Sequence, residues 1–218
     1  MSKKNLKWKV MIIVILLIIP AVVIALISSR NTVRPLLNQY FYENNIKTSD
    51  LDNEDSNIRA VVYNGITIED GIKSNSIIEK KAEKITKDAK NDREKAKKLY
   101  SWIGANIEYD NNKADKILNT KEEVLESGAI YAFRDRSGVC FDYACLYVAM
   151  ARSINLKVRL VIGEAYDGNQ YVSHAWNEVY LADEGIWIKI DTTFYIGGNY
   201  FDSDNFDKHI SKEVVGEW

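Results

Sequence analysis

The longest apolar stretch of the chain is residues 10–27, an uncharged run that reads VMIIVILLIIPAVVIALI. As a helix it would extend roughly 27 Å, close to the thickness of the hydrocarbon core of a bilayer. Four lysines precede it within residues 1–9, whereas Arg30 and Arg34 follow it. The denser positive charge at the amino-terminal end predicts a cytoplasmic basic tail over residues 1–9, a single transmembrane helix, and an extracellular remainder.

A cleaved signal peptide is the alternative interpretation of this run. We favour a retained anchor, because the run is longer than the apolar part of most signal peptides and no clean cleavage site follows it. Residues 28–57 are polar, rich in Asn and Asp, and without a clear period. They are expected to form a juxtamembrane stalk that leads into a domain over residues 58–218.

The first half of this domain has the apolar spacing of helices. Residues 76–89 and 92–106 carry apolar side chains on one face, with Asp92 as the expected N-cap of the second helix. Residues 140–151 are apolar on nearly all sides, which predicts a buried helix. Before these helices, residues 58–68 are rich in β-branched side chains around Asn64-Gly65, a pattern that indicates a hairpin.

The second half has the pattern of strands. Three runs rich in β-branched and aromatic residues are separated by glycine-containing turns, which predicts an antiparallel meander. The runs are residues 157–162, 173–181 and 186–191. Helices followed by strands predict an α+β fold in which the central helix packs on an antiparallel sheet.

Composition then excludes several classes of protein. The net charge of −2 argues against a nucleic-acid-binding protein, which usually has a basic surplus. Cys140 and Cys145 lie five residues apart on one predicted helix, where their side chains diverge, so we expect no disulfide between them. Only two histidines are present and neither has ligand spacing to a cysteine, so we expect no metal site and no cofactor.

Cys140 is the first candidate for chemistry. Gly138-Val139 forms a turn directly before it, and an apolar helix begins at the cysteine. A thiol at a helix amino terminus faces unpaired N–H groups, which favour the thiolate. Gly138 and Asp142 are taken to mark an exposed helix start, whereas Cys145 is assigned to the core.

His174 and Asp191 are the candidate partners of this thiol. Successive antiparallel strands can bring the two side by side, although each alone could be an ordinary strand or turn residue. Together with Cys140 they supply a nucleophile, a base, and an acid that orients the base. His209 lies beside Lys208 in a polar carboxy-terminal segment, and we expect it at the surface.

These motifs resemble the transglutaminase core family, within the papain-like cysteine protease and transglutaminase superfamily. The resemblance covers roughly residues 96–194 and rests on Gly138-Val139-Cys140, His174-Ala175-Trp176, and Asp191-Thr192-Thr193. It implies Cys140 as nucleophile, His174 as base and Asp191 as orienting acid. An Ile-x-Tyr-Asp segment upstream makes Tyr109 a candidate for holding the oxyanion, and Trp102 is the other.

The resemblance implies attack of the Cys140 thiolate on an amide to give a thioester. An amine would resolve it by cross-linking, or water would resolve it by proteolysis or deamidation, and the sequence leaves that choice open. The expected substrate is a protein or peptide at the cell surface or in the cell wall. The alternative is a catalytically idle transglutaminase-like fold that serves as a binding module of the cell envelope.

Overall fold

A computed structural model describes residues 62–63, 65–119, 125–168 and 170–218. The predicted basic tail, transmembrane helix and stalk lie outside these residues. Within the described part of the chain, no helix has both the length and the apolar character needed to cross a bilayer.

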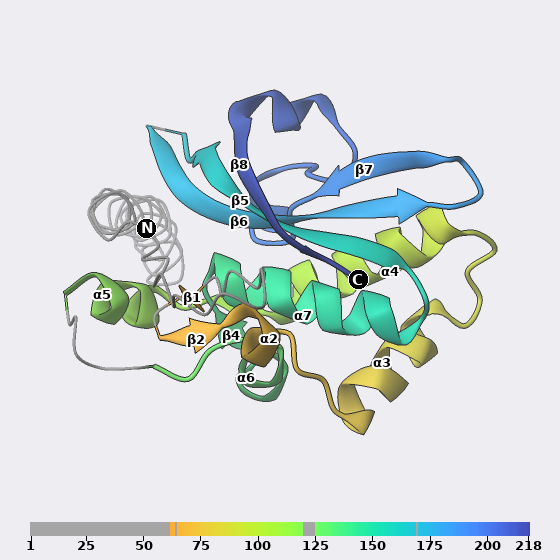
Figure 1. The fold of residues 1–218 in the computed structure, drawn as a ribbon, viewed down its shortest axis with the longest axis horizontal. Coiled ribbons are helices and arrows are strands. Elements are labelled where there is room, and N and C mark those ends of the chain that lie inside the picture. Colours follow the sequence, from red (N-terminus) through yellow and green to blue (C-terminus); the bar gives the residue numbers. More distant parts are fainter. Residues whose placement is uncertain (1–61, 64, 120–124, 169) are drawn as a thin grey trace, which may run out of the picture. The chain divides into compact units, whose positions relative to one another are not determined.

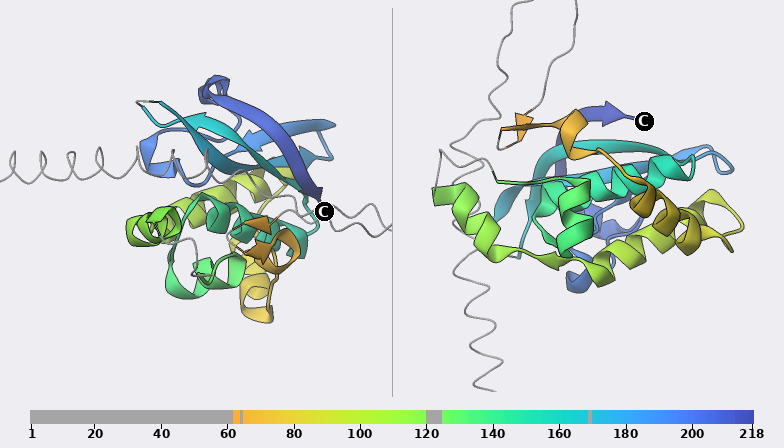
Figure 2. Two further views of the ribbon diagram at one scale, coloured as in Figure 1. Left: turned by 60° about the vertical axis from the view of Figure 1, so that its left-hand side comes forward. Right: turned by 90° about the horizontal axis from the view of Figure 1, so that it is seen from below.

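The structure has a layer of helices and a layer of sheet (Figures 1 and 2). A short hairpin of β1 (Val62–Tyr63) and β2 (Ile66–Thr67) begins the described chain, as the Asn64-Gly65 pattern predicted. The helical layer contains the following elements: α2 (Ile68–Gly71), α3 (Ser76–Thr86), α4 (Asp92–Asn106), α5 (Asn111–Asn119), α6 (Ala129–Asp135) and α7 (Cys140–Ser153).

The main sheet has four antiparallel strands in the order β7-β6-β5-β8. Its members are β5 (Lys157–Tyr166), β6 (Tyr171–Leu181), β7 (Ile186–Ile190) and β8 (His209–Glu217). The predicted meander corresponds to β5, β6 and β7. The fourth strand, β8, was not predicted, and it pairs with β5 at the edge of the sheet.

Helix α7 is the centre of the helical layer. Every residue from 140 to 151 is buried, as the continuous apolar pattern predicted. The helix packs against β5 and β6 on one side and against α3, α4 and α6 on the other (Figure 1). Asn177 on β6 fixes this packing, because its amide donates to the carbonyl of Ala144 at 3.2 Å.

The segment between β7 and β8 first packs against α4 and then covers the face of the sheet that α7 leaves free. It contains two 3₁₀ turns, η1 (Tyr195–Gly197) and η2 (Asp204–Lys208). Phe206 of η2 forms a small second core with Val161 and Trp176. This segment leads the chain from β7 at one edge of the sheet to β8 at the other edge.

Candidate active site

Cys140 is the first residue of α7, and its side chain lies at the amino terminus of that helix. The preceding residues form β4 (Ser137–Gly138), which pairs in parallel with β3 (Glu108–Tyr109). The residue is only 4% exposed, so the helix start is enclosed rather than open. The expectation of an exposed helix start was therefore wrong.

Asp142 is the reason that this turn is enclosed. Its side chain is fully buried and accepts backbone N–H groups from Val139 at 2.8 Å and Gly128 at 2.6 Å. Lys113 of α5 donates to the same carboxylate. A side chain at Gly138 would meet Cβ of Asp142 at 2.6 Å, so the turn before Cys140 needs a glycine.

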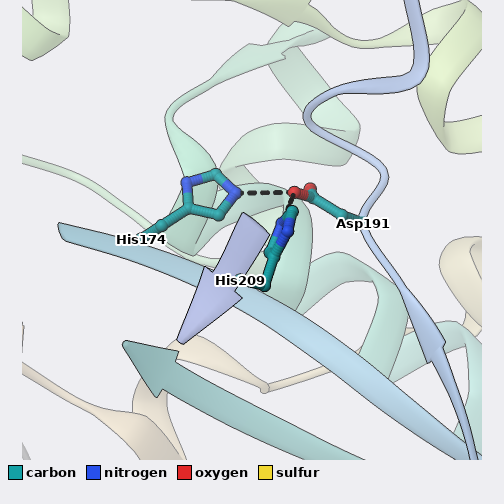
Figure 3. Close-up of side chains that lie close together, drawn as sticks. All are labelled: His174, Asp191 and His209. Atoms are coloured by element: carbon teal, nitrogen blue, oxygen red, sulfur yellow. Dashed lines mark hydrogen bonds and ion pairs between the residues drawn. The ribbon is translucent and has the colours of Figure 1, made fainter. Parts of the chain in front are cut away.

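His174 and Asp191 lie together at the end of the sheet. His174 is on β6, and Asp191 follows the last residue of β7. Nε2 of His174 is 2.8 Å from Oδ2 of Asp191 (Figure 3), and the other carboxylate oxygen accepts the N–H of Thr193 at 2.9 Å. The ring of Phe194 stacks on His174 with centroids 4.6 Å apart, which fixes the plane of the imidazole.

The surroundings of this pair favour its ionised form. Burial by itself would lower the pKa of His174, but the charge and hydrogen bond of Asp191, with the Cys140 thiol, raise that pKa to about 10. Burial would raise the pKa of Asp191, whereas the two histidines beside it hold that pKa well below its usual range. An imidazolium paired with a carboxylate is therefore the stable state at neutral pH.

The Cys140 thiol lies close enough to the ring of His174 to raise the pKa of that imidazole. Because Nε2 of His174 contacts Asp191, the nitrogen left for the thiol is Nδ1. An imidazolium next to a thiol favours the thiolate. The three residues named from the sequence thus lie in one connected chain from sulfur to carboxylate.

The surroundings of Cys145 differ from those of Cys140. It is fully buried on the same helix, in agreement with its assignment to the core. Burial raises the pKa of its thiol well above the ordinary value. The two cysteines of the chain therefore differ strongly in their surroundings.

The two oxyanion candidates lie in different places. Tyr109 on β3 pairs with Gly138, and the next N–H, that of Asp110, donates to the carbonyl of Gly138 at 2.9 Å. This pairing puts Tyr109 beside the turn that leads into Cys140. Trp102 on α4 instead packs against Phe133, with Arg136 over its ring at 4.9 Å.

His209 is a site residue that the sequence did not reveal. It begins β8, is 7% exposed, and places Nε2 at 2.9 Å from the same Oδ2 of Asp191 (Figure 3). The prediction of a surface histidine was wrong because β8 joins the sheet beside β5 and Phe206 of η2 packs against the imidazole. The one available signal was the β-branched residues that follow it, Ile210, Val214 and Val215, which could have indicated a strand.

Two histidines and an aspartate could also hold a metal ion. Among the described residues, the ligand atoms of His174, Asp191 and His209 lie within 4.8 Å of one another. Each Nε2, however, lies at hydrogen-bond distance from one shared carboxylate oxygen, an arrangement satisfied by two N–H donors.

Residues 79–192 match the model of the transglutaminase-like superfamily. One similar solved structure is a proposed cysteine protease from Cytophaga hutchinsonii, with a TM-score of 0.48 and 23% identity over 66% of this chain and 45% of that one. Another is a TGase, with a TM-score of 0.44 and 23% identity over 61% of this chain and 33% of that one.

A third similar structure is a proposed protease from Parabacteroides distasonis, with a TM-score of 0.42 and 11% identity over 56% of this chain and 25% of that one. The chain therefore spans less than half the length of each of these structures. No curated protein matches the chain. Since the matched residues 79–192 make up more than half of its 218 residues, the chain belongs to the transglutaminase-like superfamily.

Proposed function

We propose that the chain is a cysteine enzyme that forms a thioester from an amide substrate. The observation that carries the proposal is the 2.8 Å contact between Nε2 of His174 and Oδ2 of Asp191, with the Cys140 thiol next to the same imidazole. In this role Cys140 is the nucleophile, His174 is the acid and base, and Asp191 holds the imidazole in its tautomer and orientation.

The first half of the reaction transfers the acyl group to the enzyme. In the state that reacts, the proton of the Cys140 thiol is already on Nδ1 of His174, so that a thiolate faces the imidazolium, and this thiolate attacks the amide carbonyl carbon. The C–N bond then breaks, and the departing amine takes the proton from His174. The product is a thioester on Cys140 and a free amine or ammonia.

The second half transfers the acyl group to an acceptor. An amine or a water molecule gives a proton to His174 and attacks the thioester, and the thiolate leaves. The same residues serve both acceptors, so the chain is a transglutaminase-like acyltransferase or a peptidase or amidase according to which of the two enters.

The negative charge that forms on the carbonyl oxygen needs donors at the start of α7. The N–H of Cys140 stands at this helix terminus and is the first donor we propose. Tyr109 is the second, since β3 holds it beside Gly138. Trp102, packed against Phe133, is the less favoured candidate.

We also propose that the enzyme works outside the cell. The support is the apolar run over residues 10–27 and the lysines before it, which favour a single-pass anchor with a cytoplasmic amino terminus. Its substrate would then be a protein or peptide at the cell surface or in the cell wall. Periplasmic or surface accessibility of a protease site placed after residue 218 would test this orientation.

A substrate panel tests the reaction. The full chain is incubated with glutamine-containing proteins and peptides, with and without a primary amine. Incorporation of the amine indicates cross-linking, chain cleavage indicates a protease, and ammonia release without either indicates a deamidase. Cys140→Ala should abolish the product, whereas Cys145→Ala should retain it.

The competing interpretation is an idle fold that binds an envelope component. It requires that a thiol-directed probe labels Cys140 no faster than Cys145, and that His174→Ala does not change the labelling. The absence of product from every substrate together with this labelling result would contradict the enzymatic proposal.

A further inference from the structure

His209 contacts the acid of the site next to His174, with the two imidazole centroids 5.8 Å apart. Both imidazoles place Nε2 on the same oxygen of Asp191, at 2.8 Å from His174 and 2.9 Å from His209 (Figure 3). With the N–H of Thr193 on Oδ1, the carboxylate accepts three hydrogen bonds. The acid of the proposed site is thus held from β6, from β8, and from its own turn.

Aromatic rings surround His209 on several sides. The centroid distances from its ring are 4.5 Å to Phe206, 5.1 Å to Trp176, 5.6 Å to Tyr200 and 5.8 Å to Phe194. Its side chain is only 1% exposed. The imidazole can therefore neither turn away from Asp191 nor exchange that partner for water.

Packing alone does not explain why a histidine lies among these aromatic rings. Nδ1 of His209 is buried and has no hydrogen-bond partner among the residues that the structure describes. An unpaired buried polar atom is unfavourable, and a phenylalanine would fill the same space without it. What a phenylalanine cannot supply is the N–H that Nε2 donates to Asp191.

We propose that His209 is a positioning residue of the active site, which keeps the Asp191 carboxylate aimed at His174 through a second N–H donor on the same oxygen. This inference rests on the proposed function of Cys140 and His174. Asp191 lies in a buried position where its charge depends on these donors, because water cannot replace them. With the carboxylate fixed, His174 keeps Nδ1 directed at the Cys140 thiol.

The rate at which iodoacetamide alkylates Cys140 tests this without a known substrate. The thiolate attacks the carbon of the reagent and displaces iodide, and the mass of the modified peptide separates Cys140 from Cys145. We would measure the rate from pH 5 to pH 10 in the full chain. The first variant is His209→Phe, which fills the space between the aromatic rings but has no N–H to donate to Asp191. The second is His209→Gln, whose side-chain amide can donate to Asp191 from a similar position.

We expect His209→Phe to slow alkylation near pH 6 by roughly a factor of 10 to 100, the effect of losing a hydrogen bond to a charged group. The rate near pH 10, where the thiolate forms without help, should approach the wild-type value. His209→Gln should restore much of the loss near pH 6. With an active substrate, kcat should fall in His209→Phe while KM stays near its wild-type value.

Tyr147→Phe controls for a general loss of stability. It removes a buried hydroxyl that donates to the carbonyl of Ala96 at 3.1 Å, in a part of α7 two turns beyond Cys140. It should lower the melting temperature and leave the alkylation profile unchanged. A purely structural role for His209 predicts the same result for His209→Phe, and that result would overturn the inference.

Two further outcomes would also overturn it. One is a profile of His209→Phe that moves toward lower pH, which would mean that His209 weakens the His174–Asp191 pair. The other is an equimolar transition metal that the purified wild type binds and His209→Phe does not. Failure of the proposed function is distinguishable, since His174→Ala would then leave the alkylation of Cys140 unchanged.

Discussion

Lys113 and Asp142 form a buried ion pair next to the start of the Cys140 helix, with Nζ 2.6 Å from Oδ2. Their side chains are 5% and 0% exposed. Lys113 also donates to the carbonyl of Glu126 and lies 3.8 Å from the ring centroid of Tyr131. Helix α5 therefore supplies the counter-charge that keeps the turn before Cys140 closed.

Replacing Lys113 by methionine should destabilise the protein strongly. The variant leaves the Asp142 carboxylate buried without its counter-charge, which typically reduces the free energy of unfolding by about 3–5 kcal/mol. Urea unfolding of the full chain measures the loss. Lys84→Met on the exposed side of α3 is the matched control and should change little. An equally small decrease of the free energy of unfolding in both variants would contradict a structural role for the Lys113–Asp142 pair.

The stability of the protein should depend on the protonation of His174. Its pKa is about 10 in the folded protein, against about 6.5 in an unfolded chain. A group with a raised pKa stabilises the fold fully below its unfolded pKa, and that contribution is lost as pH rises through the folded pKa. We therefore expect the free energy of unfolding to decrease between about pH 6.5 and pH 10.

His174→Phe isolates this contribution from the other groups that titrate in the same range. Urea unfolding at pH 6, 8 and 10 should give a shallower decrease for the variant than for the wild type. Tyr147→Phe, which changes no group near the site, should keep the wild-type slope. If the free energy of unfolding of His174→Phe decreased with pH as steeply as that of the wild type, His174 would not be held as the imidazolium in the folded state.

Chelation should leave the reactivity of Cys140 unchanged. The proposed proton transfer and attack are assigned to His174 and Cys140, and the contacts of Asp191 are satisfied by two imidazole N–H groups. Alkylation rates before and after treatment with EDTA, at constant pH and ionic strength, test this. A change of rate that added zinc reverses would assign the histidine pair to a metal instead.

The sequence was informative where a local pattern decides the structure. The unbroken apolar run after Cys140 predicted the buried helix, and alternating strand residues predicted β5, β6 and β7. The proximity of His174 and Asp191 followed from the pairing of β6 with β7, since each lies at or near the same end of the sheet. Local spacing and one hairpin were sufficient for this part of the site.

The rest depended on contacts between segments far apart in the chain. Asp142 is buried because Lys113, from a helix 29 residues earlier, reaches its carboxylate. His209 joins the site because β8 pairs with β5, and no local pattern specifies that pairing. A polar residue that is buried through a distant partner has the same local sequence pattern as an exposed one, so both were assigned to the surface.

Gly104 of α4 should be required for the position of the segment between β7 and β8, because Tyr195 of that segment packs directly on it. An added Cβ would lie 2.2 Å from Cγ of Tyr195, and the neighbouring Phe194 stacks on His174 at 4.6 Å. Gly104→Ala should therefore destabilise the protein by about 1–3 kcal/mol, as overpacking does, and slow the alkylation of Cys140. Gly197→Ala is the matched control, since its Cβ would have no atom within 4 Å. If Gly104→Ala instead stabilised the protein, as the better helix propensity of alanine alone would predict, the contact between α4 and this segment would not support the site.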